Sequence, residues 1–269
     1  MASSGSHAGS VHGIAVERGL NMPSWNFLVA SKFDHFGNFV VTKRDLVFAA
    51  YVPLGAVEHP PDINPDNFTP RQPINNPYFP LPVGRLFVYE GTKEGVPTHD
   101  EICVTGQTRV IEGVQATVVH HQSFEGNPRV LVEDTRDFHA QDIFHNVWYL
   151  GEDTIEIPSG STEGSWESGV NDADAGFIML ANPHVGDQYY QEFAPKVAED
   201  QAKVLSTDES LIVRGVTYNN AILTKETSRL DPGVVEYKYF APGIGFILGV
   251  MIRGGDERTE LAGIGTCSE

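Results

Sequence analysis

A succession of strand-length segments from residue 83 onward constrains this chain more than any other feature. Segments such as 85–91 and 245–254 have the length and the apolar content of β-strands, and turns rich in Gly and Pro separate them. Glu112–Gly113 joins two such segments, and Asp231–Pro232–Gly233 joins another two. The sequence therefore predicts a mainly β fold, a curled antiparallel sheet or barrel-like single domain with a Pro-rich N-terminal arm.

The chain divides into four parts by composition. We expect an N-terminal extension over 1–56, a Pro-rich linker over 57–82, an antiparallel β domain over 83–254 and a polar, frayed tail over 255–269. Within the β domain, 195–205 fits a short helix as well as part of a strand pair.

The stretch 43–60 has two interpretations. Two basic residues, an apolar run and small residues are typical of a signal peptide, whose start would lie downstream of Met1. The alternative is a buried strand. Asp45 and Pro53 count against the signal peptide. No clear signal peptide begins at Met1, and no apolar run reaches the length of a membrane span.

The charge balance limits the partners. The chain has 36 acidic and 18 basic residues, a net charge of -18, which repels the phosphate backbone of nucleic acids. We therefore expect a small-molecule ligand or substrate. The sequence contains no phosphate-binding Gly-rich loop. It identifies no cofactor and does not indicate the oligomeric state.

The two cysteines form no zinc motif. Cys103 lies in the apolar stretch ICVTG, which indicates a buried free thiol, and Cys267 lies in the predicted tail. A disulfide between the two is the alternative.

The richest collection of chemical groups lies in the predicted hairpin of 129–142 and 146–157. Side chains alternate between the two faces of a strand, so Glu133, Asp137 and His139 share one face. They either face water, as one side of an antiparallel sheet commonly does, or line the concave side of a curled sheet. By the same alternation Trp148 and Glu152 share one face of the partner strand, and Tyr149 points to the other.

Candidate catalytic groups follow from this pattern. Acid/base chemistry needs His, Asp or Glu side chains within reach of one substrate, and the candidates are His120, Asp137, His139, Glu152 and Glu167. His120 and His121 point to opposite faces, so one of the two could join Asp137 and His139 in a set suited to zinc or iron.

Candidate ligand contacts are four aromatic side chains and one neighbouring carboxylate. They are Trp148, Tyr149, Tyr189, Glu192 and Tyr237. If Glu167 or Glu192 is buried beside an aromatic ring, its pKa rises and it can act as a general acid. The alternative for these aromatics is ordinary core packing.

Several stretches resemble a group of uncharacterised, mostly secreted bacterial proteins. They are 77–91 (PYFPLPVGRLFVYEG), 137–154, 164–170, 183–200 and 236–246 (EYKYFAPGIGF). The first and last are also similar to more distant lipoprotein-type domains with a strongly curved antiparallel sheet. The resemblance implies a β fold and a secreted or periplasmic location, and no activity. Relatives carry Gly where this chain has His145.

Two hypotheses about function follow. The first is a small-molecule binding protein that holds an apolar or aromatic ligand in the concave face of the sheet. The second is an acid/base enzyme, a lyase, isomerase or hydrolase, that uses His, Asp and Glu in the same cavity with or without a metal. No catalytic motif is complete, so the sequence leaves open whether the protein is an enzyme.

Overall fold

The computed structural model describes residues 32–33, 39–40 and 59–268. In the first part, β1 (Lys32–Phe33) and β2 (Phe39–Val40) form a short antiparallel pair. The stretch 43–56, with its leader and core-strand interpretations, lies outside the described residues.

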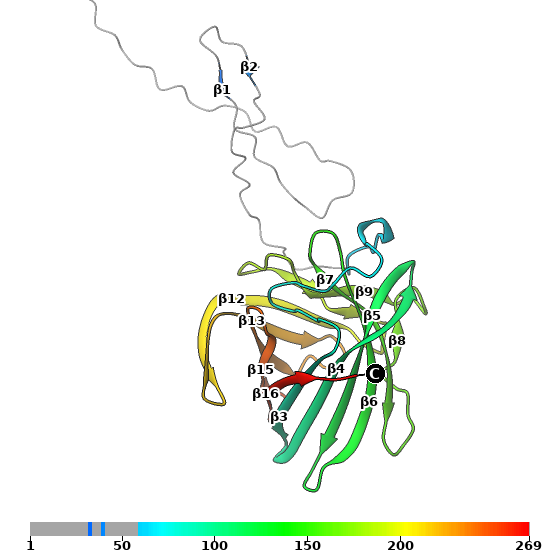
Figure 1. Ribbon diagram of the computed structural model, residues 1–269, viewed down its shortest axis with the longest axis vertical. Helices are drawn as coiled ribbons and strands as arrows, with labels where there is room; N and C mark the ends of the chain where they lie inside the picture. Colours follow the sequence, from blue (N-terminus) through cyan, green and yellow to red (C-terminus); the bar gives the residue numbers. More distant parts are fainter. Residues whose placement is uncertain (1–31, 34–38, 41–58, 269) are drawn as a thin grey trace, which may run out of the picture. The chain divides into compact units, whose positions relative to one another are not determined.

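Residues 59–268 are almost entirely β-structure, as the sequence predicts (Figure 1). A 3-10 turn, η1 (Pro65–Asn67), precedes the strands. The strands are β3 (Arg85–Lys93), β4 (Val96–Ile111), β5 (Val114–Glu125), β6 (Val130–Gln141), β7 (Val147–Glu156), β8 (Trp166–Glu167), β9 (Asp174–Met179), β10 (Gln188–Tyr190), β11 (Glu192–Phe193), β12 (Asp200–Val213), β13 (Val216–Ser228), β14 (Val235–Ala241), β15 (Gly245–Arg253) and β16 (Glu257–Thr266). The helix considered for 195–205 is absent, because β12 begins at Asp200 and pairs with β13.

The sheet is antiparallel and nearly closes into a barrel. Its order is β10-β12-β13-β14-β15-β16-β3-β4-β5-β6-β7-β9-β11, and β8 adds to β7. The two strands at the ends of this order, β10 and β11, are consecutive in sequence and separated by Gln191 alone. One short segment therefore runs along both edges of the sheet and draws them together.

Two-residue turns set the register of the long hairpins. Ile111 pairs with Val114 around Glu112–Gly113, whose φ angles are 47° and 81°. Positive φ at both central residues is the requirement of the tight type I′ turn, and Gly meets it at no steric cost. In the β6–β7 turn, His145 has a φ of 72°, so it occupies a left-handed conformation that Gly adopts more readily.

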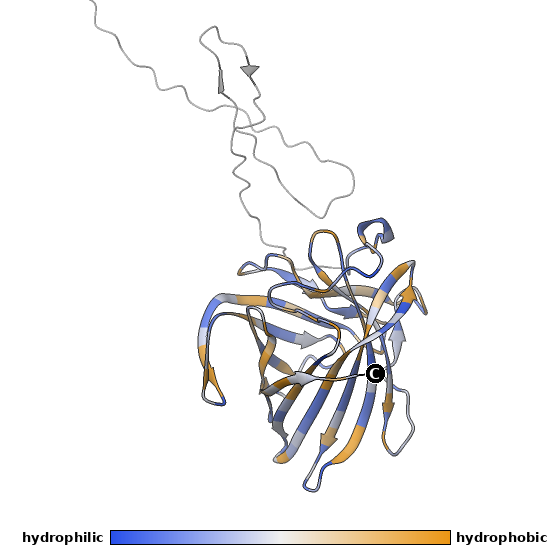
Figure 2. Ribbon diagram, in the orientation of Figure 1, coloured by the Kyte–Doolittle hydropathy of each residue, from blue (hydrophilic) through white to orange (hydrophobic). Residues whose placement is uncertain are grey.

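Strand alternation gives the barrel two different faces. Along β3 to β6 the ribbon changes repeatedly between hydrophilic and hydrophobic residues (Figure 2). Large side chains such as Phe87, Ile102 and Val119 point into the lumen, where they line a cavity. The lumen is therefore the place where the barrel buries side chains and can hold a ligand.

Two segments differ from the sequence prediction. The expected frayed tail contains β16, which pairs with β3 over most of its length and with β15 at Leu248–Val250. The expected linker packs on the barrel, with Ile74 and Leu81 buried in the main core. Both predictions rested on polar or Pro-rich composition. In the structure, pairing with β3 orders the polar tail, and apolar contacts with the barrel order the Pro-rich segment.

A disulfide joins Cys103 and Cys267, so the predicted free thiol is wrong. The Cα atoms lie 6.0 Å apart, and the bond ties the residue that follows β16 to β4. The two strands are not neighbours, since β3 lies between them. Because β16 brings the tail back to this place, two cysteines 164 residues apart can meet.

We expect the Cys103→Ala/Cys267→Ala double variant to have a free energy of unfolding about 2–5 kcal/mol lower than the oxidised protein, because the bond closes a long loop in the unfolded chain. Urea denaturation of both proteins measures the difference. The wild type under reducing conditions is the control and should behave as the double variant does. Equal midpoints for oxidised and reduced wild type would contradict the prediction.

Candidate functional site

A cavity of about 280 Å³ lies in the barrel lumen. Its apolar wall consists of Phe79, Pro80, Leu81, Phe87, Ile102, Val119, Ile178, Phe240, Ile244 and Phe246. Its polar residues are Tyr89, His121, Asp137, His139, Tyr149, Gln191, Glu226 and Lys238. A concave, mainly apolar space with a few converging polar groups is the usual form of a small-molecule site.

The Pro-rich arm forms one wall of this cavity. Phe79 lies 5.6 Å from the His139 ring and 6.3 Å from the Phe240 ring, centroid to centroid. The arm is anchored by Asn76, which is fully buried and donates to the carbonyls of His145 and Leu180. The arm is therefore part of the site, a role that the sequence analysis did not assign to it.

The central polar cluster joins Asp137, Tyr149 and Glu152. The Tyr149 hydroxyl lies 2.6 Å from Oδ1 of Asp137 and 2.9 Å from Oε2 of Glu152. Burial raises the pKa of Glu152 to about 7, and the charge of Asp137 adds to the rise. A phenol has one proton, so the Glu152 carboxyl, when protonated, donates to Tyr149 while Tyr149 donates to Asp137.

A bulge in β7 places Tyr149 and Glu152 on the same side. Asp137 pairs with Glu152 and His139 pairs with Tyr149, so β7 has one more residue than β6 over this interval. Gly151 lies in the extra length, with a φ of 143°, and a Cβ there would approach the Trp166 carbonyl oxygen to 2.4 Å. The prediction that Tyr149 and Glu152 point to opposite faces is therefore wrong, because simple alternation does not hold across a bulge.

His139 completes this side of the cavity. Its ring stacks on Tyr149 at 4.8 Å between centroids and 24° between planes. Burial lowers the pKa of His139 despite the nearby Asp137 charge, so the imidazole is neutral at neutral pH. Its buried Nδ1 atom has no hydrogen-bond partner among the described residues, an unusual state for a buried polar atom.

His121 also faces the cavity and bonds to Asp100 and Ser123. Its Nε2 lies 3.3 Å from Oδ1 of Asp100 and 3.2 Å from Oγ of Ser123, and Ser123 lies 2.7 Å from Asp100. Burial acts to lower the pKa of His121, but the hydrogen bond to Asp100 and nearby carboxylates raise it above its ordinary value. A catalytic triad needs serine and aspartate on different ring nitrogens, so this set is an ion pair and not a nucleophile with its base.

A second charged group lies on β13 and β14. Nζ of Lys238 is 2.8 Å from Glu226 and 3.4 Å from Glu236. Burial acts to lower the pKa of Lys238, but the charges of Glu226 and Glu236 raise it well above its ordinary value. Lys238 is therefore a charged group on the cavity wall whose charge is already balanced.

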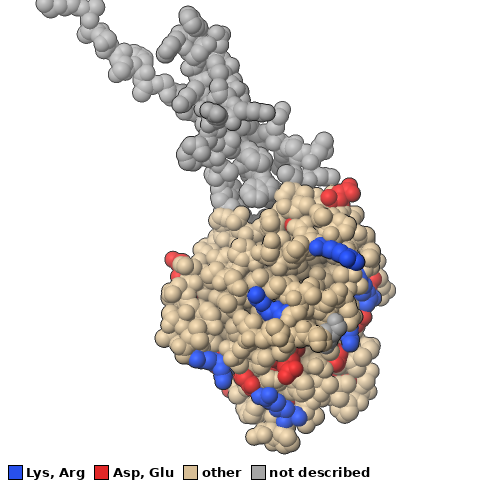
Figure 3. Space-filling view, viewed as in Figure 1, with Lys and Arg blue, Asp and Glu red and all other residues tan. Residues whose placement is uncertain are grey.

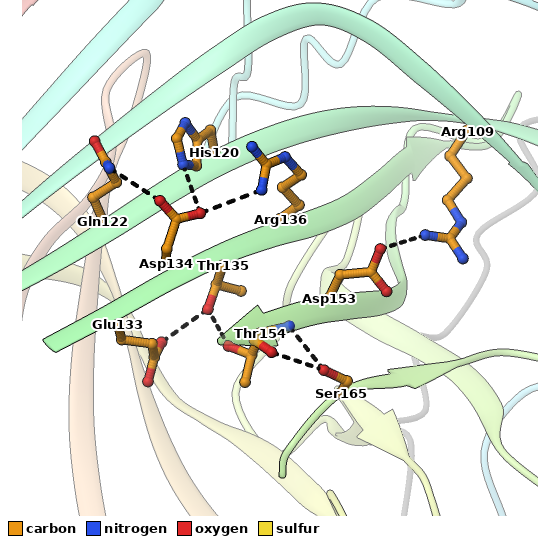
Figure 4. Close-up of polar contacts among 10 residues, drawn as sticks. All are labelled: Arg109, His120, Gln122, Glu133, Asp134, Thr135, Arg136, Asp153, Thr154 and Ser165. Atoms are coloured by element: carbon orange, nitrogen blue, oxygen red, sulfur yellow. Dashed lines mark hydrogen bonds and ion pairs between the residues drawn. The ribbon is translucent and has the colours of Figure 1, made fainter. Parts of the chain in front are cut away.

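His120 lies on the outer face and does not join Asp137 and His139. Its Nε2 is 3.0 Å from Asp134, which also accepts from Gln122 and Arg136 (Figure 4). His121, and not His120, is therefore the histidine of this pair that lines the lumen cavity with Asp137 and His139. No group of three or more metal-ligating side chains occurs among the described residues.

Glu167 and Trp148 also lie away from the cavity. Glu167 pairs with Arg109, which contacts Asp153 as well. Trp148 packs against Phe68 and Phe177, and its indole nitrogen donates to Asp142. The structure does not bring either residue to the lumen cavity.

The other three predicted residues, Glu192, Tyr189 and Tyr237, are not part of the cavity wall. Glu192 accepts from the Trp166 indole, and burial raises the pKa of Glu192 well above its ordinary value, with the charges of Asp200 and Glu152 adding to the rise. Tyr189 is buried in the main core. Tyr237 alternates with Lys238, so it points away from the lumen. None of the three lines the cavity.

Among the ten residues predicted from sequence, Asp137, His139 and Tyr149 lie on the cavity wall, and Glu152 bonds to Tyr149. The sequence analysis missed His121, Glu226, Lys238 and the arm residues. A charged Lys inside the otherwise aromatic 237–240 stretch was the available signal for Lys238. The arm offered no such signal, because its Pro-rich composition is typical of a linker.

No protein-family model matches this chain, and no curated protein matches it. Two solved structures are similar. One is a "putative lipoprotein" from Parabacteroides distasonis, with 14% identity and a TM-score of 0.37 over 70% of this chain and 98% of that one. The other is a "putative exported protein" with a YmcC-like fold from Bacteroides fragilis, with 12% identity and a TM-score of 0.37 over 70% of this chain and 99% of that one. Both are bacterial proteins of the kind that the sequence resembles, and at this TM-score neither bears on the site.

The raised pKa of Glu152 predicts a pH dependence of stability. Between pH 4.5, its ordinary pKa, and about 7, the folded protein keeps a proton that the unfolded chain has released, so the free energy of unfolding falls as pH rises through this window. We expect Glu152→Gln to remove about 1–3 kcal/mol of this fall, as measured by urea denaturation at several pH values. The exposed Glu156→Gln on the same strand is the control, and parallel pH curves for wild type and Glu152→Gln would contradict the prediction.

Proposed function

We propose that the barrel binds a small molecule with an apolar or aromatic body in its lumen cavity. One observation carries the proposal: a space of about 280 Å³ with a mainly apolar wall also has the polar side chains of Asp137, His139 and Tyr149 on its wall. A ligand with an apolar body and one polar group matches such a wall. The volume is near the lower end of the usual range for ligand sites, about 300–1,000 Å³, which favours a compact ligand.

The face of the molecule drawn in Figure 3 gives no support to a polymeric anion as the partner. On the face drawn in Figure 3, Lys and Arg side chains are dispersed and do not gather into a basic patch. Within the described part of the chain, no helix is long and apolar enough to cross a membrane.

We also propose a location outside the reducing cytosol, secreted or periplasmic. The support is the disulfide between Cys103 and Cys267, since such bonds persist mainly in oxidising compartments.

A second candidate, acid/base catalysis in the same cavity, is favoured by the sharing of the Tyr149 hydroxyl between two carboxylates. Asp137 on the cavity wall would take a proton from a carbon next to a carbonyl group. Glu152, whose pKa is about 7, could exchange a proton with it through Tyr149. Such a proton transfer needs no metal and no redox partner.

The binding proposal predicts that 2-phenylethanol, a small aromatic probe, binds to the lumen in about the millimolar range, as expected for a ligand of this size. Saturation-transfer NMR and titration measure it. Ile178→Trp should abolish binding by filling the cavity, whereas Val110→Trp, at an exposed position on β4, should bind as the wild type does. Native mass spectrometry of the purified protein adds a search for a retained ligand. If neither the probe nor a retained molecule binds, the proposal fails.

The catalytic candidate predicts that the protein accelerates deuterium exchange next to the carbonyl of 4-phenyl-2-butanone in D₂O, and that Asp137→Asn removes the acceleration. NMR follows the loss of the proton signal. Equal exchange rates with and without protein, under conditions where the ketone binds, would eliminate this candidate and leave the binding proposal in place.

A further inference from the structure

Three of the hydrogen-bond donors on the cavity wall are already engaged by carboxylates, including both cationic side chains. His121 bonds to Asp100, Lys238 bonds to Glu226, and the Tyr149 hydroxyl bonds to Asp137 and Glu152. A ligand that offers only acceptors would have to compete with these carboxylates for their donors. An anionic ligand would therefore find both cationic groups of the wall, His121 and Lys238, already paired.

The acceptors on the same wall are not exhausted. Tyr149 is the one described residue that donates to the Asp137 side chain, through Oδ1, so Oδ2 remains available. Next to it lies the neutral His139, which is 6% exposed and lines the same cavity. A carboxylate oxygen and a neutral imidazole side by side favour a ligand group that brings protons and positive charge.

A second cavity, of about 360 Å³, gives independent support from electrostatics. Its wall includes the carboxylates of Asp100, Glu125, Glu133, Glu156 and Glu257 and one basic residue, Lys93. Asp100 on its wall bonds to His121 on the wall of the first cavity. A pocket lined by one sign of charge concentrates ions of the opposite sign.

From these observations, and resting on the proposed binding function, we infer that the ligand is a small apolar or aromatic amine. Its protonated nitrogen binds between Asp137 and His139, and its body packs against the aromatic wall that includes Phe79 and Phe240. The acidic second cavity raises the local concentration of such cations next to the site.

Three probes with one common body test the inference: 2-phenylethylamine, 2-phenylethanol and phenylacetate. Titration calorimetry and NMR with the full chain should show the amine binding at least about tenfold more tightly than the alcohol, the equivalent of one charged hydrogen bond, and the acid binding most weakly. Asp137→Asn should weaken amine binding about tenfold or more and leave alcohol binding within about twofold. Asp134→Asn, the same change on the outer face of the same strand, should leave all three affinities unchanged.

The outcomes separate this inference from the proposed function. Binding of the alcohol or the acid at least as tightly as the amine would overturn the amine inference and leave a lumen binding site in place. Absence of binding for all three probes, together with no retained molecule in native mass spectrometry, would overturn both. An amine that binds equally well to wild type and Asp137→Asn, with both folded by circular dichroism, would overturn the assignment of Asp137 as its partner.

Discussion

Closure of the sheet is the constraint on which the rest of the structure depends. Thirteen strands follow one another in the sheet formed by residues 59–268, and the segment 188–193 runs along both edges. A barrel with many strands encloses more space than its own inward side chains fill. The arm residues Phe79–Leu81 occupy part of this space, and the cavity is the part that stays empty.

The polar groups in the lumen are difficult to explain by stability alone. Lys238 lies among Glu226 and Glu236, and His121 lies against Asp100, so each of these half-buried cations has a carboxylate partner. Buried ion pairs contribute little to stability after the cost of desolvation, and apolar side chains of similar volume often serve as well. The concentration of shifted pKa values around one cavity is typical of functional sites.

Local patterns in the sequence predict the fold well. Strand-length segments and turns such as Glu112–Gly113 identify the antiparallel sheet and several of its hairpins. They do not predict β16 or the packing of the arm. A polar strand between two neighbours and a Pro-rich segment on an apolar wall owe their order to partners distant in the chain.

Two bulges explain which site residues could not be predicted. A register shift between Ser123 and Phe124 changes the pairing of β5 with β6 by one residue, and as a result His121 pairs with Thr135. Without the shift, His120 would pair with Thr135 and would face the lumen in place of His121. The bulge in β7 acts in the same way on Tyr149 and Glu152. One extra residue moves a whole set of side chains to the opposite face, and single-sequence alternation has no means of detecting it.

The binding and catalytic interpretations meet in the charge of Asp137. That charge is one reason why the pKa of Glu152 rises to about 7. A cationic ligand held by Asp137 would offset the same charge, so it would lower the pKa of Glu152 and favour loss of its proton. A neutral ligand would leave the proton in place. Ligand charge and the protonation of the Asp137–Tyr149–Glu152 cluster are therefore linked. A site that recognises an amine also releases a proton when the amine binds. A site that performs proton transfer on a neutral carbonyl compound keeps the Glu152 proton.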